Sequence, residues 1–179
     1  MTDFSKPFTQ QEAIPQGGID RAVEIMQSGR LHRYNLAEGE ESEASLLEQE
    51  YATYQGADYC LACTSGGYAI ALALRIVGVK PGDLVLANAY TLAPVPGAIH
   101  NVGAKPVLIE INDDYHIDCD DLLEKAASSG AKVLLLSHMR GHIADMDRIV
   151  RICADHGITL VEDCAHTMGA SWQGIRSGN

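Results

Sequence analysis

The 179-residue sequence is poor in basic residues, with 13 lysines and arginines against 24 aspartates and glutamates. The resulting net charge of −11 argues against a nucleic-acid partner, because nucleic-acid-binding surfaces gather Lys and Arg. No apolar run reaches the roughly 18 residues that a membrane helix needs. The amino terminus lacks a basic start followed by an apolar stretch, so no secretory signal is predicted. These absences favour a cytoplasmic protein with neither a membrane nor a nucleic acid as partner.

Cysteine is also sparse, and no pattern of cysteines predicts a disulfide framework or a metal site. Cys60 and Cys63 form a C-x-x-C pair, but neither a second pair nor an H-x-x-x-H follows to complete a tetrahedral zinc site. Five cysteines without a secretory signal indicate reduced thiols in the cytoplasm. We therefore predict buried, inert cysteines and no bound metal.

Apolar runs typical of strands alternate with helical patterns over the last two thirds of the chain. The strand-like runs are 58–63, 84–88, 105–111, 132–138 and 158–163. The helical patterns are 67–77, 91–101, 118–128 and 145–156. Alternation with short connections predicts an α/β fold with a mainly parallel sheet. The nearly continuous apolar character of the later strands indicates that helices cover both faces.

The first third of the sequence has a different organisation. Residues 1–14 form a polar arm, and helical spacing begins near Ile19 and stops at Gly29. A second helix, capped by Ser42 or by Ser45, leads to Gly56. The predicted organisation is therefore an amino-terminal arm with helices over 1–57, followed by an α/β domain over 58–179.

Thr64, Ser65, Gly66 and Gly67 make the turn between the first predicted strand and its helix. Two glycines let the backbone approach a ligand closely, and the first N–H groups of a helix favour anions. This turn is a candidate phosphate cradle. It fits an ordinary hydroxyl-capped helix start equally well.

Two further candidates follow later strands and therefore belong to the same edge of a parallel sheet, where ligands bind. Asp163 ends the last apolar run, where a carboxylate is costly to bury without a positive partner, and His166 follows three residues later. Glu162 alternates to the opposite face and is interpreted as structural. Tyr90, after the run 84–88, is interpreted as a lid over a planar ligand or as a packing residue.

A phosphate cradle, an aromatic lid and a carboxylate for a ring nitrogen together describe a site for pyridoxal 5′-phosphate (PLP). The segments that carry these features, "TSGGYAIALAL", "NAYTLAPVPGAI", "GHIADMD" and "VEDCAHTMGA", occur in one order. In that order they resemble the DegT/DnrJ/EryC1/StrS sugar aminotransferases, which are PLP enzymes of fold type I. The resemblance covers about residues 15–179 and implies the large, PLP-binding domain of that fold.

The resemblance implies a role for each matching residue of the cofactor site. Asp163 pairs with the pyridine nitrogen, and His166 lies beside the ring hydroxyl. Gly66 and Gly67 offer backbone N–H groups to the phosphate. The family has threonine where Gly67 stands, so the hydroxyl contact falls to Ser65 or Thr64.

One further implied position departs from the family pattern, and one further segment has a second explanation that involves no function. Leu92 stands where the family has the aromatic residue that stacks on the ring. Either Leu92 covers the ring by apolar contact, or Tyr90 shifts to take that place. The segment "GRLHRYN" matches a stretch near the substrate entrance. A solvated loop explains the same segment as well. Its candidate residues are Arg30, His32, Arg33 and Tyr34.

The resemblance also requires a lysine that binds the cofactor covalently, and no lysine stands in a matching context. The lysines are Lys6, Lys80, Lys105, Lys125 and Lys132. The expectation is therefore that the chain is the first part of a longer protein and lacks the carboxy-terminal domain. The family builds its active site at a dimer interface, so the longer protein is expected to be a homodimer.

The implied activity is amino transfer from an amino acid, with glutamate as the expected donor, to a keto group of a nucleotide-linked sugar. Two alternatives stay open from the sequence. The first is a PLP-dependent sugar dehydratase of the same family, in which histidine replaces the lysine. The second is a non-catalytic, split or degenerate homologue. A Rossmann dehydrogenase is disfavoured because no G-x-G-x-x-G follows the first strand-like run.

Overall fold

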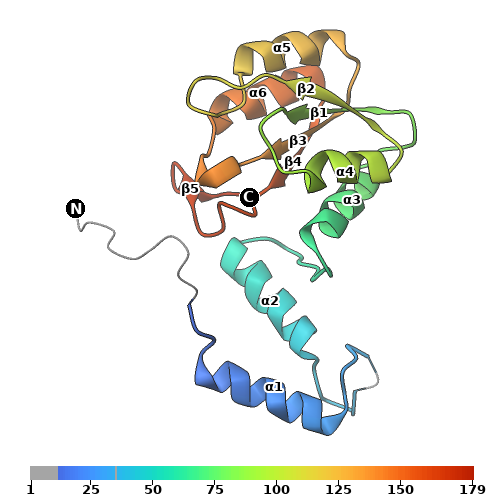
Figure 1. The fold of residues 1–179 in the computed structure, drawn as a ribbon, viewed down its shortest axis with the longest axis vertical. Coiled ribbons are helices and arrows are strands. Elements are labelled where there is room, and N and C mark those ends of the chain that lie inside the picture. The colour runs from blue at the N-terminus through green and yellow to red at the C-terminus, as the bar shows by residue number, and fades with distance from the viewer. Residues whose placement is uncertain (1–11, 35) are drawn as a thin grey trace, which may run out of the picture. The chain divides into compact units, whose positions relative to one another are not determined.

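The computed structural model describes residues 12–34 and 36–179. The chain divides into a first compact unit that ends at Glu50 and a second unit, Tyr51–Asn179 (Figure 1). The polar arm predicted for residues 1–14 falls largely outside the described residues.

The amino-terminal part of the described chain contains the two helices that the sequence predicts. Helix α1, Gln16–Ser28, ends at Gly29, whose φ of 69° lies in the left-handed region that glycine adopts without strain. Helix α2, Glu43–Gln55, begins in the first unit and ends in the second. Ser42 caps α2, because its Oγ accepts the Ser45 N–H at 3.1 Å.

The second unit contains a four-stranded parallel sheet, which confirms the predicted α/β fold. Its strands are β1 (Leu84–Asn88), β2 (Lys105–Ile109), β3 (Val133–Ser137) and β4 (Thr159–Asp163). The strand order is β2-β1-β3-β4, and every neighbouring pair is parallel. The connecting helices are α3 (Gly66–Ile76), α4 (Pro94–Asn101), α5 (Cys119–Ser128) and α6 (Met146–His156).

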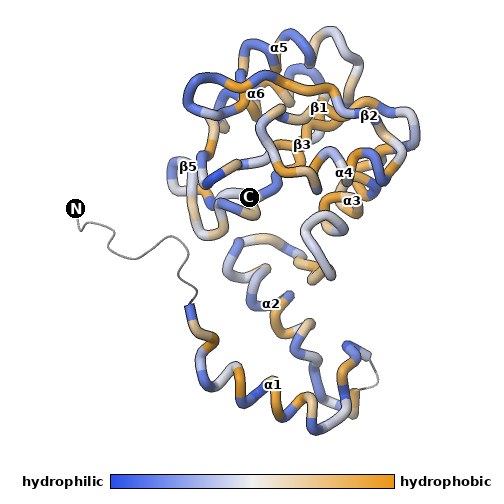
Figure 2. Tube along the Cα trace, viewed as in Figure 1, coloured by the Kyte–Doolittle hydropathy of each residue, from blue (hydrophilic) through white to orange (hydrophobic). Residues whose placement is uncertain are grey.

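Side chains alternate along the strands, so each face of the sheet builds its own core. Leu86, Leu134 and Leu136 face α5 and α6, whereas Val85 and Leu135 face α3 and α4. Helices α5 and α6 lie on one side of the sheet, and α3 and α4 lie on the other (Figure 1). The apolar stretches of β1 and β3 run through the middle of the second unit in Figure 2. Helices thus cover both faces of the sheet, as predicted.

The predicted strand 58–63 is not a strand in the structure. Residues 57–63 form an irregular segment, and no strand of the described residues pairs with them. An alternating sequence becomes a strand only when a neighbouring strand pairs with it, and no strand of the described sheet is in register with this segment. The prediction failed because a local pattern does not contain the partner.

The glycine-rich carboxy-terminal segment contains regular structure that the sequence did not predict. After β4 the chain forms a short antiparallel hairpin from β5 (Ser171–Trp172) and β6 (Ile175–Arg176). Gly174, with φ of 87°, makes its tight turn possible. The hairpin segment is tied to the end of α2, because Gln55 Nε2 donates to the Ser177 carbonyl at 2.7 Å.

All five cysteines are free thiols, but they are not all buried as predicted. Cys119 and Cys153 are buried, whereas Cys60, Cys63 and Cys164 are half-buried. Burial among apolar side chains raises the pKa of Cys153 from 9.0 to about 11.

We expect Cys153 to alkylate about 100-fold more slowly at pH 8 in the folded chain than in the urea-unfolded chain. The shift of its pKa from 9.0 to about 11 lowers the thiolate fraction by about that factor, and the thiolate is the nucleophile. Iodoacetamide labelling followed by peptide mass spectrometry measures the two rates. Equal rates in the folded and unfolded chain would show that Cys153 does not lie in this core.

Candidate functional site

Three polar residues end three neighbouring parallel strands at one edge of the sheet. Asn88 ends β1, Ser137 ends β3 and Asp163 ends β4. Ser137 and Asp163 are register partners. Because the strands are parallel, these ends lie at the carboxyl edge, where ligands of open α/β sheets bind.

The turn before α3 presents two backbone N–H groups that donate to no described residue. Ser65 is the N-cap, and its Oγ accepts the Tyr68 N–H at 3.2 Å. Among the described residues, no hydrogen bond uses the N–H of Gly66 or Gly67. A Cβ placed on Gly66 would meet no atom within 4 Å, so the helix start is open to a ligand. Free N–H groups at a helix N-terminus attract anions.

The α3 turn and Asp163 belong to the same face of the sheet. Ala71 and Leu74 of α3 pack in the same cluster as Leu135 and Val161. Asp163 lies two residues beyond Val161 on the same strand, so its side chain is directed to that face. The anion-attracting turn and the carboxylate are therefore placed where one ligand could contact both.

The Asp163 carboxylate is half-buried and held from two sides. Its Oδ2 accepts the hydroxyl of Ser137 at 3.3 Å, and its Oδ1 accepts the Ala165 N–H at 3.2 Å. Each oxygen keeps a further lone pair. The carboxylate is thus oriented by the protein and can still accept an N–H from a ligand.

His166 is exposed in the loop that follows β4, and its ring is oriented by a backbone contact. The Arg140 N–H donates to His166 Nδ1 at 3.1 Å. Because Nδ1 accepts this bond, the neutral ring carries its proton on Nε2. Arg140 has a φ of 58°, which is uncommon for a residue other than glycine and is often found at functional sites.

Tyr90 and Leu92 lie in the segment between β1 and α4, in different surroundings. The Tyr90 ring packs against the Tyr115 ring, with centroids 5.4 Å apart and the planes tilted by 46°. Leu92 is 51% exposed. Tyr90 is therefore already packed on a neighbouring ring, whereas Leu92 is available to a ligand.

Asn88, Thr91 and Ser137 are polar residues of this edge that sequence reasoning missed. Asn88 and Ser137 are buried, and Thr91 donates to the Ser137 hydroxyl at 2.8 Å. The available signal was weak: each is a polar residue at or just past the end of an apolar run. Their significance depends on the strand register, which brings together residues 46 and 49 positions apart.

The other face of the sheet edge carries a separate polar group. Glu162 is a register partner of Leu136, and its Oε2 lies 2.7 Å from His138 Nε2. With Cys164, these side chains place three metal-ligand types within 4.8 Å of one another. Burial raises the pKa of the Cys164 thiol, which disfavours the thiolate that binds metals. The His138–Glu162 hydrogen bond engages Nε2 of the imidazole, whereas the buried Nδ1 of His138 has no hydrogen-bond partner among the described residues.

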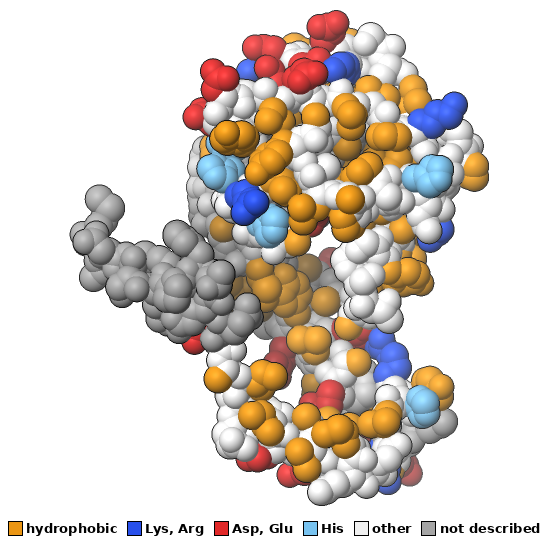
Figure 3. Space-filling view, in the orientation of Figure 1, with side chains coloured by type: hydrophobic (Ala, Val, Ile, Leu, Met, Phe, Trp, Pro, Cys, Tyr) orange, Lys and Arg blue, Asp and Glu red, His pale blue; other side chains and the backbone are white. Residues whose placement is uncertain are grey.

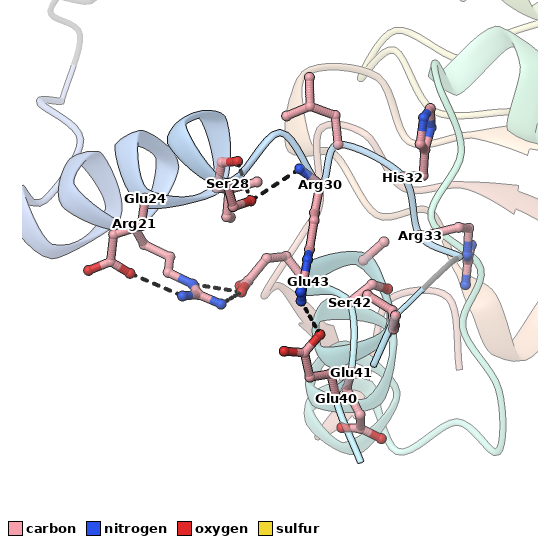
Figure 4. A pocket seen from close by; sticks show the side chains of 14 residues that line it. Arg21, Glu24, Ser28, Arg30, His32, Arg33, Glu40, Glu41, Ser42 and Glu43 are labelled. Atoms are coloured by element: carbon pink, nitrogen blue, oxygen red, sulfur yellow. Dashed lines mark hydrogen bonds and ion pairs between the residues drawn. The ribbon is translucent and has the colours of Figure 1, made fainter. Parts of the chain in front are cut away.

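The basic residues predicted near a substrate entrance line a hollow of about 550 Å³ within the first unit (Figure 4). Their charges are paired there: Arg30 contacts Glu40, and Arg33 makes a two-pronged contact with Glu48 at 2.7 and 3.0 Å. The Ala37 N–H and then Arg30 lower the pKa of Glu40. His32 stacks on Tyr34, with centroids 5.0 Å apart. The arginines are thus engaged by carboxylates of the same unit.

The described lysines do not lie at the carboxyl edge of the sheet. Lys80, Lys105 and Lys132 stand before or at the start of β1, β2 and β3, which is the opposite edge. Lys125 lies in α5 and pairs with Asp121 at 2.7 Å. Lys6 lies outside the described residues.

A match to the DegT/DnrJ/EryC1/StrS aminotransferase family covers residues 16–179. The chain belongs to this family. Its aminotransferases use pyridoxal 5′-phosphate. The resemblance inferred from the segments around Gly66 and Asp163 is thereby confirmed.

Two curated relatives show what the chain is similar to. It is 39% identical over 176 residues to the dTDP-3-amino-3,4,6-trideoxy-alpha-D-glucose transaminase of Streptomyces venezuelae, covering 98% of this chain and 44% of the relative. It is 35% identical over 172 residues to the 3-amino-5-hydroxybenzoate synthase of Amycolatopsis mediterranei, covering 96% and 42%. The chain thus spans about two fifths of the length of these relatives.

Solved structures support the fold assignment. The crystal structure of 3-amino-5-hydroxybenzoic acid synthase superposes with a TM-score of 0.83 at 32% identity, covering 96% of this chain and 44% of that one. The structure of DesV from S. venezuelae gives a TM-score of 0.78 at 32% identity, covering 91% and 43%. No helix among the described residues is long and apolar enough to cross a membrane.

Proposed function

We propose that the enzyme containing this chain transfers an amino group from an amino acid to a keto group on a nucleotide-linked sugar or a similar cyclic substrate. The observation that carries the proposal is the placement of Asp163 and the Gly66–Gly67 turn on one face of the carboxyl edge. The proposed donor is glutamate. The relatives include an amino-sugar transaminase and a 3-amino-5-hydroxybenzoate synthase, which supports a cyclic acceptor.

The residues of this edge fit PLP in their chemistry. The N–H groups of Gly66 and Gly67, which donate to no residue within 12–34 and 36–179, suit the phosphate, and the Ser65 hydroxyl stands beside them. Asp163 accepts a hydrogen bond from the protonated pyridine nitrogen, and the carboxylate keeps that nitrogen protonated. When bound, the cofactor supplies an electron sink for the carbanion formed at the amino carbon.

The remaining site residues orient and cover the bound ring. His166, with its proton on Nε2, donates to the ring oxygen, and the Arg140 N–H fixes the direction of that donation. Leu92 covers one ring face through apolar contact, because its side chain is half-exposed and Tyr90 is packed on Tyr115. Covering the ring excludes water from the reacting carbon.

Two further parts of the proposal concern the whole protein. The lysine that moves the proton comes from outside residues 1–179, and the active protein is a homodimer. Ile19, Val23 and Met26 form an exposed apolar stripe on α1 that suits a subunit contact. Exposed apolar side chains are visible on the first unit in Figure 3. Five free thiols fit a cytoplasmic protein.

We expect the enzyme containing residues 1–179 to convert L-glutamate to 2-oxoglutarate over repeated cycles only when PLP and a keto sugar nucleotide are both present. Chromatography of the sugar product measures the amine that the reaction forms. The matched control omits the amino donor. Consumption of the keto sugar with release of water and no amine product would contradict amino transfer and identify a dehydratase instead.

A further inference from the structure

We propose that Ser137 is a positioning residue for Asp163, and that Thr91 and Asn88 complete a hydrogen-bond relay that holds the carboxylate toward the ring nitrogen of the ligand. This inference rests on the proposed function. It assigns a role to three residues other than those proposed to bind the phosphate or the ring. The relay runs from the segment after β1, through the end of β3, to the end of β4.

The direction of the relay follows from its donors. Thr91 Oγ1 donates to Ser137 Oγ at 2.8 Å, and Ser137 Oγ donates to Asp163 Oδ2 at 3.3 Å. A serine hydroxyl has a single proton, so accepting from Thr91 leaves that proton for Asp163. Consecutive hydrogen bonds polarise one another, which strengthens the bond to the carboxylate.

Asn88 fixes the middle of the relay by binding the backbone of Ser137 on both sides. Its Oδ1 accepts the Ser137 N–H at 2.9 Å, and its Nδ2 donates to the Ser137 carbonyl at 3.2 Å. Nδ2 also donates to the Tyr90 carbonyl at 2.8 Å. Asn88 is 2% and Ser137 is 5% exposed, so these bonds form away from water. The serine hydroxyl is therefore held in one place.

The relay couples the carboxylate to the segment that covers the ring. Thr91 precedes Leu92, the residue proposed to contact the ring face, and the same segment carries the Tyr90 carbonyl bound by Asn88. Ser137 ends a strand that is otherwise apolar and fully buried. Burying its hydroxyl costs free energy unless hydrogen bonds compensate for the lost water. The relay thereby holds Leu92, which is proposed to cover the ring, at a fixed distance from the Asp163 carboxylate.

The test compares two ligands of the enzyme containing residues 1–179: pyridoxamine 5′-phosphate, and its deaza analogue, in which CH replaces the ring nitrogen. Ser137→Ala is expected to weaken binding of pyridoxamine 5′-phosphate about tenfold, as for loss of a hydrogen bond to a charged group. Binding of the deaza analogue should change less than about twofold, because that ligand offers Asp163 no N–H.

A second pair of variants keeps the test valid if Ser137→Ala also alters packing. Thr91→Val removes the outer donor and keeps the side-chain shape, and should weaken binding of pyridoxamine 5′-phosphate about threefold. Thr91→Ser keeps the hydroxyl and should bind like the parent. Thermal unfolding without ligand shows whether each variant is folded.

The outcomes separate this inference from the proposed function. A parent enzyme that binds both ligands equally tightly would overturn the assignment of Asp163 to the ring nitrogen. A parent that binds pyridoxamine 5′-phosphate more tightly than the deaza analogue supports the proposed function. If Ser137→Ala and Thr91→Val then keep the parent's ratio of the two affinities, the relay alone is overturned. Equal weakening of both ligands by the variants also overturns it, because that result indicates a structural role.

Discussion

Replacing Asp163 by asparagine is expected to lower turnover by the enzyme containing this chain about 100- to 1,000-fold, the usual cost of removing one preorganised electrostatic group. The half-buried carboxylate stands at the end of β4, oriented by Ser137 and by the Ala165 N–H. Asparagine keeps the size of the side chain but carries no charge, so in the proposed site the ring nitrogen would lose the group that keeps it protonated.

The measurement for Asp163→Asn is the steady-state rate of amine formation at saturating PLP. Asp155→Asn is the matched control, because Asp155 is an exposed residue of α6 and should leave the rate unchanged. Turnover within about threefold of the parent for Asp163→Asn would contradict the role assigned to this carboxylate.

Replacing Gly66 by aspartate is expected to weaken binding of pyridoxamine 5′-phosphate about 100- to 1,000-fold, because like charges brought together cost several kcal/mol. The Gly66 N–H belongs to the open start of α3, and a Cβ there meets no atom within 4 Å. An acidic residue in the first turn favours the helix, so the fold should be retained.

Pyridoxamine, which lacks the phosphate, provides the control for Gly66→Asp. Its dissociation constant, measured by fluorescence titration, should change little, because the repulsion acts on the phosphate. Gly17→Asp, in α1, is the matched change of charge elsewhere: nothing lies within 4 Å of a Cβ at that position. Equal losses for the two ligands would mean that the α3 turn does not hold the phosphate.

The charge distribution of the second unit is consistent with an anion at the α3 turn. Acidic side chains gather over α5, on the other face of the sheet from α3 (Figure 3). The acids of that helix include Asp120, Asp121 and Glu124. The net negative charge of the chain does not argue against the proposed phosphate site, because the N–H groups at the start of α3 and the helix dipole act locally.

Much of the fold could be predicted because the strands that form are nearly continuous apolar runs between glycine-ended helices. The stretch 58–63 shows the limit of this reasoning: its pattern is that of a strand, yet no described strand pairs with it. The hairpin from β5 and β6 was missed because each of its strands has only two residues, which is too short for a recognisable strand pattern. In both segments the secondary structure depends on which strands pair in the fold, and a local sequence pattern does not specify that pairing.

The candidate site could be predicted only where one residue stood out from its surroundings. Asp163 did so as a carboxylate at the end of an apolar run, and Gly66 and Gly67 did so as a double glycine between strand-like and helical patterns. The contacts of Ser137 with Asn88 and Asp163 depend on strand order and register. The contact of Arg140 with His166 joins two loops 26 residues apart. Such contacts appear only in the folded structure.

The most direct measurement is a crystal structure of the enzyme containing residues 1–179 with pyridoxamine 5′-phosphate bound. We expect a carboxylate oxygen of Asp163 within about 2.6–3.2 Å of the pyridine nitrogen. We expect the phosphate of the same molecule at the N–H groups of Gly66 and Gly67. A ligand whose ring nitrogen faces any other residue, or whose phosphate lies away from the start of α3, would contradict the proposed site.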